Sequence, residues 1–340
     1  MPRVRANSSR RCRRRFDMSA QRHHEYNALD LPELFDALAR NDAEAMVTRG
    51  LAEDLGATDG SQGFRGDLTS AAAIAPSTRG RATIVSRADG TLAGLPVVHM
   101  VAQRAGLACA PHLADGMRVT RGSRIATLEG PYAAMLAHER TMLNFLTLLS
   151  GNATLTARFV EAVHGTRAKI CDTRKTIPGL RTLQKYATRC GGGTLHRIGL
   201  FDAVLLKDNH LGVFEPGTLG ARVRAAAQKA RAIATPSFVE CEVDSLAQLD
   251  ELLEMLKQTP NTIDLVLLDN MDAASLADAV ARRDACAPAL LLEASGGVRL
   301  DSVRTIALSG VDRISVGAIT HSAPALDLGL DFETRLDQGA

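Results

Sequence analysis

The sequence predicts an α/β protein whose C-terminal half forms a barrel-like parallel sheet. After Gly130-Pro131, short apolar segments alternate with amphipathic stretches, which is the pattern of βα units. The N-terminal half instead contains short segments of alternating polarity bounded by Gly-containing turns, which favours an antiparallel sheet. A chain of 340 residues has room for two domains, or for one barrel with an appended domain.

Composition narrows the class of protein. A hydrophobic content of 46% with 23% charged residues is typical of a globular protein with a sizeable core. We expect no membrane association, because no window approaches the run of about eighteen apolar residues that a spanning helix needs. The six cysteines show no CxxC and no metal-type spacing, so we expect a reducing, cytoplasmic environment.

Charge is unevenly distributed. Residues 1–22 hold eight arginines against one acid, and the rest of the chain has 32 basic and 37 acidic residues. A mildly acidic body argues against nucleic-acid binding, which needs a broad basic face. For residues 1–24 three interpretations stay open: a basic disordered arm, a targeting peptide, or translation from an upstream start with Met18 as the true first residue. The scarcity of apolar residues weakens the targeting interpretation, and we exclude this arm from the fold.

The N-terminal elements follow from local patterns. Apolar residues at roughly helical spacing predict two helices between Leu31 and Asp54. Residues 56–67 are a Gly/Asp-rich loop, and alternation from Arg81 to Arg87 predicts a strand. Further short strands are expected within 91–96 and 117–131, giving an antiparallel sheet covered by helices.

The C-terminal elements begin with a long helix, predicted from Ala133 to Leu149 and ending near Gly151. Six strands and four intervening helices then alternate, which suggests a barrel more than an open sheet. The strands are expected within 168–173, 203–208, 237–245, 264–270, 289–297 and 312–320, and the helices at 221–234, 245–257, 273–283 and 300–308.

Polar or small residues follow each predicted strand, where the active sites of such barrels lie. One such coincidence would mean little, but six predict a site. The residues are Thr173, Arg174, Lys175, Lys207, Glu242, Asp269, Ser295, Gly296, Gly297 and Gly317.

The segment from Lys169 to His210 concentrates positive charge among apolar runs. Arginine and lysine at strand ends suit a small substrate with several negative charges, because guanidinium forks pair with carboxylates and phosphates. The alternative is a basic surface helix, which residues 183–189 alone would support. The cations are Arg174, Lys175, Arg181, Lys185, Arg189, His196, Arg197 and Lys207. There is no GxxxxGK[ST] or GxGxxG motif, which argues against P-loop and dinucleotide folds.

Several ordered motifs give the chain a family resemblance. They are LAEDLG, GDLTS, DTRKTIPGLR, KYATRCGGGTLHRIGLFDAVLLKDNH, VECEVDS, LLDN, EASGG and ALDLGL. In this order they resemble quinolinate phosphoribosyltransferase, from about Leu31 to Phe332. The resemblance implies an incomplete (β/α) barrel at 139–321 and an N-terminal α/β sandwich domain at 25–138, completed by the C-terminal tail at 322–340.

The resemblance also implies a reaction. Phosphoribosyl pyrophosphate and quinolinate would give nicotinate mononucleotide, pyrophosphate and CO2, with Mg2+ as cofactor. The family pattern implies a homodimer in which Arg140 reaches the neighbouring site and holds a quinolinate carboxylate. The residues alone favour a surface arginine paired with Glu139 or solvent.

By the same resemblance Arg174, His196, Arg197 and Lys207 line the quinolinate pocket, with Thr173 beside them. A dianion in a partly dry site needs compensating charge and bidentate partners. Lys175 corresponds to the lysine near the phosphoribosyl donor. We expect its side chain to point away from that of Arg174, because neighbours on a strand alternate.

Two acids are expected opposite these cations. Glu242 and Asp269 would stabilise positive charge at the ribose C1 and hold ribose hydroxyls or Mg2+ through water. Glu240 is a rival for Glu242, and the resemblance implies Glu242, because the spacing in VECEV matches the family's second acid. Either acid could instead cap a helix or form an ion pair. Backbone amides of Ser295, Gly296, Gly297 and Gly317 would bind phosphate beside a helix N-terminus.

Three rival functions remain at this point. The first is a transferase of the same fold acting on another acid such as nicotinate, which would need fewer cations. The second is an inactive barrel kept as a binding protein, although no expected acid or arginine is missing. The third is nucleic-acid binding through residues 1–22.

Overall fold

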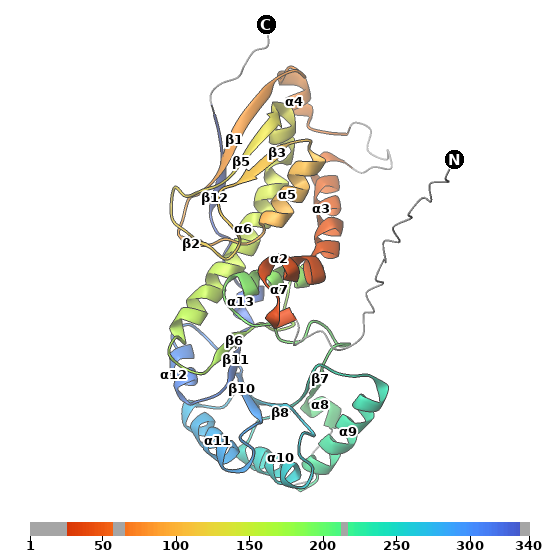
Figure 1. Cartoon of the computed structure of the whole chain (residues 1–340), viewed down its shortest axis with the longest axis vertical. Helices are drawn as coiled ribbons and strands as arrows, with labels where there is room; N and C mark the ends of the chain where they lie inside the picture. The colour runs from red at the N-terminus through yellow and green to blue at the C-terminus, as the bar shows by residue number, and fades with distance from the viewer. Residues whose placement is uncertain (1–25, 57–64, 212–216, 334–340) are drawn as a thin grey trace, which may run out of the picture.

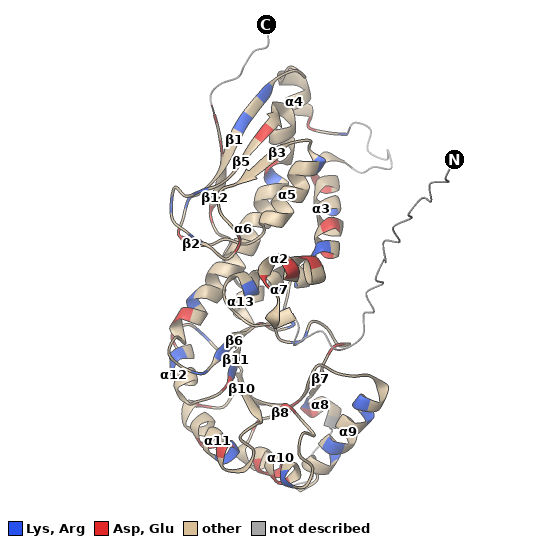
Figure 2. Cartoon of the chain, in the orientation of Figure 1, with Lys and Arg blue, Asp and Glu red and all other residues tan. Residues whose placement is uncertain are grey.

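The computed structural model describes residues 26–56, 65–211 and 217–333. The predicted basic arm and most of the Gly/Asp-rich loop lie outside these residues. None of the helices within them combines the length and apolar character needed to cross a membrane. Lysine and arginine occur together with aspartate and glutamate in both halves of the molecule (Figure 2).

The N-terminal half contains a four-stranded antiparallel sheet in the order β12-β1-β5-β3. Its central strands are β1 (Arg79–Ser86) and β5 (Arg124–Pro131), with β3 (Ala108–Pro111) at one edge. The other edge is β12 (Leu328–Phe332), which comes from the end of the chain and pairs with β1 so that Phe332 lies opposite Ala82 (Figure 1). The prediction that the C-terminal tail completes this sheet is confirmed. A second, two-stranded sheet joins β2 (Gly90–Thr91) and β4 (Arg118–Val119).

Helices cover one side of this sheet. They include α4 (Leu68–Ala73) and α5 (Leu95–Arg104). The prediction of two helices between Leu31 and Asp54 is wrong, because α2 (Leu31–Leu34), a π-helical turn η1 (Phe35–Ala39) and α3 (Arg40–Leu55) form one continuous run. The wider π turn shifts the apolar face, which the simple helical spacing did not anticipate.

The long helix α6 (Tyr132–Ala162) connects the two halves of the molecule (Figure 1). Its predicted end near Gly151 is wrong, since the helix continues for eleven residues beyond that glycine. A Cβ atom on Gly151 would lie 2.1 Å from the carbonyl oxygen of Pro324. The glycine therefore lets the C-terminal tail cross the helix at close range, and it does not end the helix. The predicted domain boundary at 138/139 falls inside α6.

The C-terminal half contains a six-stranded parallel sheet in the order β6-β11-β10-β9-β8-β7. All six predicted strands are confirmed: β6 (Lys169–Cys171), β7 (Val204–Leu206), β8 (Val239–Val243), β9 (Leu265–Asp269), β10 (Leu291–Ser295) and β11 (Arg313–Ser315). The four predicted helices are confirmed as α9 (Leu219–Ile233), α10 (Leu246–Gln258), α11 (Ala273–Cys286) and α12 (Val303–Leu308). Three others are α7 (Arg181–Cys190), α8 (Asp208–Leu211) and α13 (Ala318–His321).

The barrel is incomplete because β6 and β7 form the two edges of the sheet. The edge of β6 is extended by the segment around Thr194, whose N–H donates to Ile170 O at 2.8 Å and whose carbonyl accepts from Asp172 N–H at 3.2 Å. This segment thus lies beside β6 and continues into His196 and Arg197. The helices α9 to α12 lie around the outside of the strands (Figure 1).

Candidate active site

A cavity of about 910 Å³ lies at the carboxyl ends of the barrel strands. Its lining includes twelve of the thirteen predicted site residues. They are Thr173, Arg174, Lys175, His196, Arg197, Lys207, Glu242, Asp269, Ser295, Gly296, Gly297 and Gly317. The thirteenth, Arg140, lies exposed on α6 and is not among the residues that line this chain's cavity.

The end of β6 carries two of the cations. The strand stops at Cys171, and Thr173 Oγ1 accepts a hydrogen bond from Lys175 N–H at 3.0 Å, which bends the chain. The strand alternation expected for Arg174 and Lys175 is wrong, because both residues follow the strand in this bend and both line the cavity. The Lys175 side chain packs beside Gly317, where a Cβ atom would be 3.2 Å from Lys175 Cδ.

Arg174 and Arg197 form a pair of like charges in the cavity wall. Burial and the neighbouring charge of Arg174 both lower the pKa of Arg197, whose side chain is almost fully buried. The buried Nε of Arg174 has no hydrogen-bond partner within the described part of the chain. Two guanidinium groups in this arrangement favour an anion between them, since bringing like charges together in a partly dry site is costly.

The loop that carries Arg197 is fixed by Asp202. Its carboxylate accepts from Ile198 N–H at 2.8 Å and from Gly199 N–H at 2.7 Å. Because these bonds define the turn before β7, Arg197 is held between two ordered segments.

The opposite part of the cavity is acidic. Glu242, late in β8, forms an ion pair with Lys207, which follows β7. Asp269 ends β9, and its Oδ2 accepts from Asn270 Nδ2 at 2.7 Å. Each acid is half-buried and faces the same cavity from a neighbouring strand.

The loop after β10 differs from the prediction. Ser295, Gly296 and Gly297 were expected beside a helix N-terminus, but α12 begins only at Val303. The two glycines instead have positive φ angles, +97° and +58°. A Cβ on Gly296 would lie 2.1 Å from Asn270 Oδ1, so only glycine fits where this loop crosses the end of β9.

A buried charge cluster begins in the cavity wall with His196 and Glu293 and continues behind it with Glu240 and Arg313. His196 Nε2 is 3.0 Å from Glu240 Oε2 and 3.3 Å from Glu293 Oε1. Arg313 Nε is 2.8 Å from the second oxygen of Glu293. Burial alone would lower the pKa of His196, but Glu293 and Glu240 outweigh it and raise the pKa to about 9. The amide of Arg197 approaches Nδ1 at 2.8 Å, which directs the proton of a neutral ring to Nε2 and towards the carboxylates.

This cluster also separates the two glutamates that the sequence left as rivals. Glu242 lines the cavity, whereas Glu240 is fully buried beside His196. Three side chains of the kinds that bind metal ions lie close together here, those of His196, Glu240 and Glu293. We assign no metal to them, because Arg313 already compensates the carboxylate charge.

Not all cations of the segment 169–210 reach the cavity. Lys185 is fully buried in an ion pair with Asp172, and Arg189 donates to the carbonyls of Gly193, Asn27 and Leu29. The alternative of a basic surface helix is wrong, since most of α7 is buried.

Sequence reasoning missed several lining residues. Asn270 follows the predicted Asp269, Glu293 lies in the EASGG motif, and Ser315 lies inside a predicted strand. His321 gave no local signal, because it reaches the cavity from the short helix α13. The missed polar residues are Asn270, Glu293, Arg299, Ser315 and His321.

Comparison with known proteins agrees with this geometry. Residues 152–331 match the model of the quinolinate phosphoribosyl transferase C-terminal domain, and residues 67–150 match that of the N-terminal domain. The chain belongs to the quinolinate phosphoribosyltransferase family. The two models meet within α6, close to Gly151.

Individual members of the family cover most of the chain. A nicotinate-nucleotide pyrophosphorylase (carboxylating) of Mycobacterium leprae is 43% identical over 78% of this chain and 91% of that protein. A chloroplastic nicotinate-nucleotide pyrophosphorylase of Oryza sativa is 35% identical over 87% of this chain and 79% of its own length. The solved structure of the Francisella tularensis enzyme has a TM-score of 0.75 at 34% identity and covers 87% of this chain and 98% of that one.

Proposed function

We propose that the cavity catalyses phosphoribosyl transfer from phosphoribosyl pyrophosphate to quinolinate, with decarboxylation. The protein is a nicotinate-nucleotide diphosphorylase (carboxylating), a phosphoribosyltransferase of NAD synthesis, and its products are nicotinate mononucleotide, pyrophosphate and CO2. The observation that carries the assignment of this cavity is the pair Arg174 and Arg197, whose mutual repulsion an anionic substrate would relieve.

Quinolinate binds, in this proposal, between the two arginines. Its adjacent carboxylates suit two guanidinium forks, and Lys207 supplies a third positive charge once it exchanges Glu242 for the substrate. His196 donates a hydrogen bond to quinolinate from the buried wall of the cavity, and Thr173 lies in the bend that follows β6. The ring nitrogen is then aligned with the ribose carbon that it attacks.

The phosphoribosyl donor lies on the other side of the cavity. Lys175 and the backbone of Ser295, Gly296, Gly297 and Gly317 face its phosphates, since the glycines leave room for close approach. Glu242 and Asp269 stabilise the positive charge that develops at C1 as the bond to pyrophosphate breaks. The positive charge of the quaternised ring nitrogen stabilises the electron pair left at C2 when CO2 departs, and a proton from solvent then adds to C2, so decarboxylation needs no further cofactor.

The donor set also suits Mg2+. Glu242 and Asp269 offer carboxylate oxygens from adjacent strands, and Mg2+ is commonly held by one or two carboxylates, substrate phosphates and water. When bound, the ion neutralises the charge of the pyrophosphate leaving group. Glu242 and Asp269 would hold it, directly or through water.

A second copy of the chain completes the site in this proposal. Arg140 is exposed on α6, outside its own chain's cavity, so it is free to reach a neighbouring cavity in a homodimer and hold a quinolinate carboxylate.

We also propose that the chain divides into a sandwich domain (25–138 with 322–340) and a barrel domain (139–321), and that the protein is located in the cytoplasm. The free thiols of Cys109, Cys171, Cys190, Cys241 and Cys286 support a reducing compartment.

The function is tested by turnover with two acids. Purified protein with phosphoribosyl pyrophosphate and Mg2+ is given quinolinate or nicotinate, and CO2 and nicotinate mononucleotide are followed. We expect product and equimolar CO2 with quinolinate only. Product from nicotinate but not quinolinate would support the related transferase for another acid, and no turnover with either would support a binding protein.

A further inference from the structure

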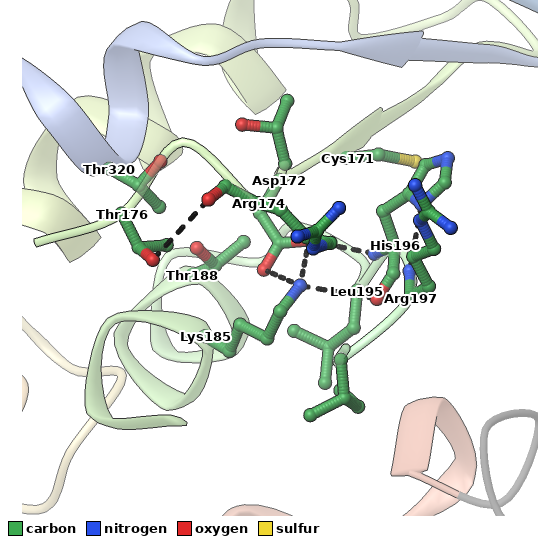
Figure 3. A network of polar contacts seen from close by, with 12 residues as sticks. Cys171, Asp172, Arg174, Thr176, Lys185, Thr188, Leu195, His196, Arg197 and Thr320 are labelled. Atoms are coloured by element: carbon green, nitrogen blue, oxygen red, sulfur yellow. Dashed lines mark hydrogen bonds and ion pairs between the residues drawn. The ribbon is translucent and has the colours of Figure 1, made fainter. Parts of the chain in front are cut away.

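Asp172 and Lys185 form a fully buried ion pair that the proposed reaction does not use. Both side chains have 0% exposure, and neither lines the cavity. Lys185 Nζ lies 2.7 Å and 2.8 Å from the two carboxylate oxygens of Asp172. Figure 3 shows the lysine extending from α7 to the aspartate, with Arg174, His196 and Arg197 around the pair.

The pair joins three segments of the site. Asp172 is two residues before Arg174, and its Oδ1 accepts the backbone N–H of His196 at 2.7 Å. Lys185 donates its third proton to the carbonyl oxygen of His196 at 3.2 Å. Both peptide groups that flank the His196 side chain are therefore tied to the end of β6 and to α7.

Stability alone does not account for this arrangement. Burial lowers the pKa of Lys185 and raises the pKa of Asp172, which is the cost of removing both charges from water. Replacing a buried ion pair by apolar groups of similar volume is often neutral or stabilising. The pair instead provides a fixed geometry, because the three hydrogen bonds of one ammonium group join the Asp172 carboxylate to the backbone carbonyl of His196.

We propose that Asp172 and Lys185 are positioning residues that hold His196 and Arg197 beside Arg174 before quinolinate binds. This inference rests on the proposed function, because it assigns the three cations to quinolinate. The segment 194–197 lies along the open edge of the barrel, next to β6. The segment is also held by its β-type bonds to β6, by the Asp202 turn, by the side-chain bonds of Asn27 to Leu195 and by the contacts of the His196 ring with Glu240 and Glu293. The pair adds the bonds to the backbone N–H and carbonyl of His196 itself.

The test compares two double variants. Asp172→Asn with Lys185→Met removes both charges at nearly constant volume and keeps an acceptor for the His196 amide. Asp312→Asn with Arg283→Met removes another buried pair, with Arg283 Nη1 2.6 Å from Asp312 Oδ2, at the opposite end of the barrel strands. Quinolinate binding without phosphoribosyl pyrophosphate is measured by calorimetry, and KM for both substrates is measured by turnover.

We expect the Asp172/Lys185 variant to weaken quinolinate binding by about tenfold to a hundredfold, as is typical when groups supporting a binding residue are lost. KM for phosphoribosyl pyrophosphate changes less, because His196 and Arg197 face quinolinate. The Asp312/Arg283 variant keeps wild-type quinolinate affinity. Equal quinolinate affinity in wild type and the Asp172/Lys185 variant would overturn the inference, whereas a wild type that itself fails to bind quinolinate would count against the proposed function.

A second measurement needs no variant and decides the matter if the Asp172/Lys185 protein does not fold. Amide hydrogen exchange of His196, whose N–H donates to Asp172 Oδ1, is followed in the wild type with and without saturating quinolinate. A segment positioned in advance exchanges slowly in both states. Rapid exchange that becomes slow only with quinolinate would show that the ligand orders the segment, and would refute the proposal.

Discussion

At the scale of single residues, the environment decides which charges can meet a substrate. Lys185 and Arg174 lie in the same basic segment, yet one is neutralised by Asp172 while the other has an unpartnered nitrogen in the cavity wall. The sequence predicted the cations but could not sort them, because burial and pairing depend on strands that are distant along the chain. Glu240 and Glu242 show the same limit, since they are two residues apart on β8 and share one face of the strand. Only the structure shows that Glu240 is fully buried whereas Glu242, nearer the end of the strand, lines the cavity.

The pKa of His196 is the clearest consequence at this scale. The nearby carboxylates raise it to about 9, above the value of about 6.5 expected in the unfolded chain. The folded state therefore binds the proton more tightly, and the resulting stability is fully present below about pH 6.5 and is lost as the pH rises through about 9.

We predict that Glu293→Gln lowers the pKa of His196, because it removes the first of the two carboxylate charges that raise it. Titration of the imidazole by NMR checks this, with His196→Asn used to assign the signal. The free energy of unfolding of the wild type should also fall more steeply between pH 7 and pH 9 than that of His196→Asn. An unchanged pKa in the Glu293→Gln protein would contradict the charge balance described for the cluster.

At the scale of elements, the regular strands and helices of the barrel followed from the sequence, and the irregular ones did not. Six strands were predicted because apolar residues in parallel strands are nearly continuous. The π turn at 35–39 and the passage of α6 through Gly151 were missed. Each lies against a segment far along the chain, since Phe35 packs on Tyr186 of α7 and Gly151 lies beside Pro324, so local spacing carries little information about them.

The loop after β10 gives a prediction at this scale. Gly296→Ala should raise KM for phosphoribosyl pyrophosphate by about tenfold or more, because its methyl group would displace Asn270 and the phosphate-facing backbone. Gly106→Ala is the matched control, since Gly106 also has a positive φ but has no atom near the site of a Cβ within the described structure. Both variants should lose about 1 kcal/mol of stability from backbone strain. If both leave KM unchanged, the loop does not contact the donor.

At the scale of the whole molecule, a strand from the end of the chain joins the N-terminal sheet, and one predicted site residue lies outside the cavity. The strand β12 returns to the N-terminal sheet, which only the family resemblance predicted, since the tail lies far from β1 in sequence. The barrel positions twelve predicted residues around one cavity, while Arg140 remains outside on α6. A chain of this design acts, in our proposal, as a dimer in which each cavity receives one arginine from its neighbour.

The most direct test of this account is a heterodimer made from Arg174→Ala and Arg140→Ala chains, co-expressed with different tags and purified by both. Each homodimeric variant should lose about a hundredfold or more in kcat/KM for quinolinate, because each lacks a charged carboxylate partner. The heterodimer should recover about half of the wild-type turnover, since one of its two cavities then has both arginines. Wild-type activity in the Arg174→Ala homodimer, or a heterodimer no more active than its parents, would contradict the account.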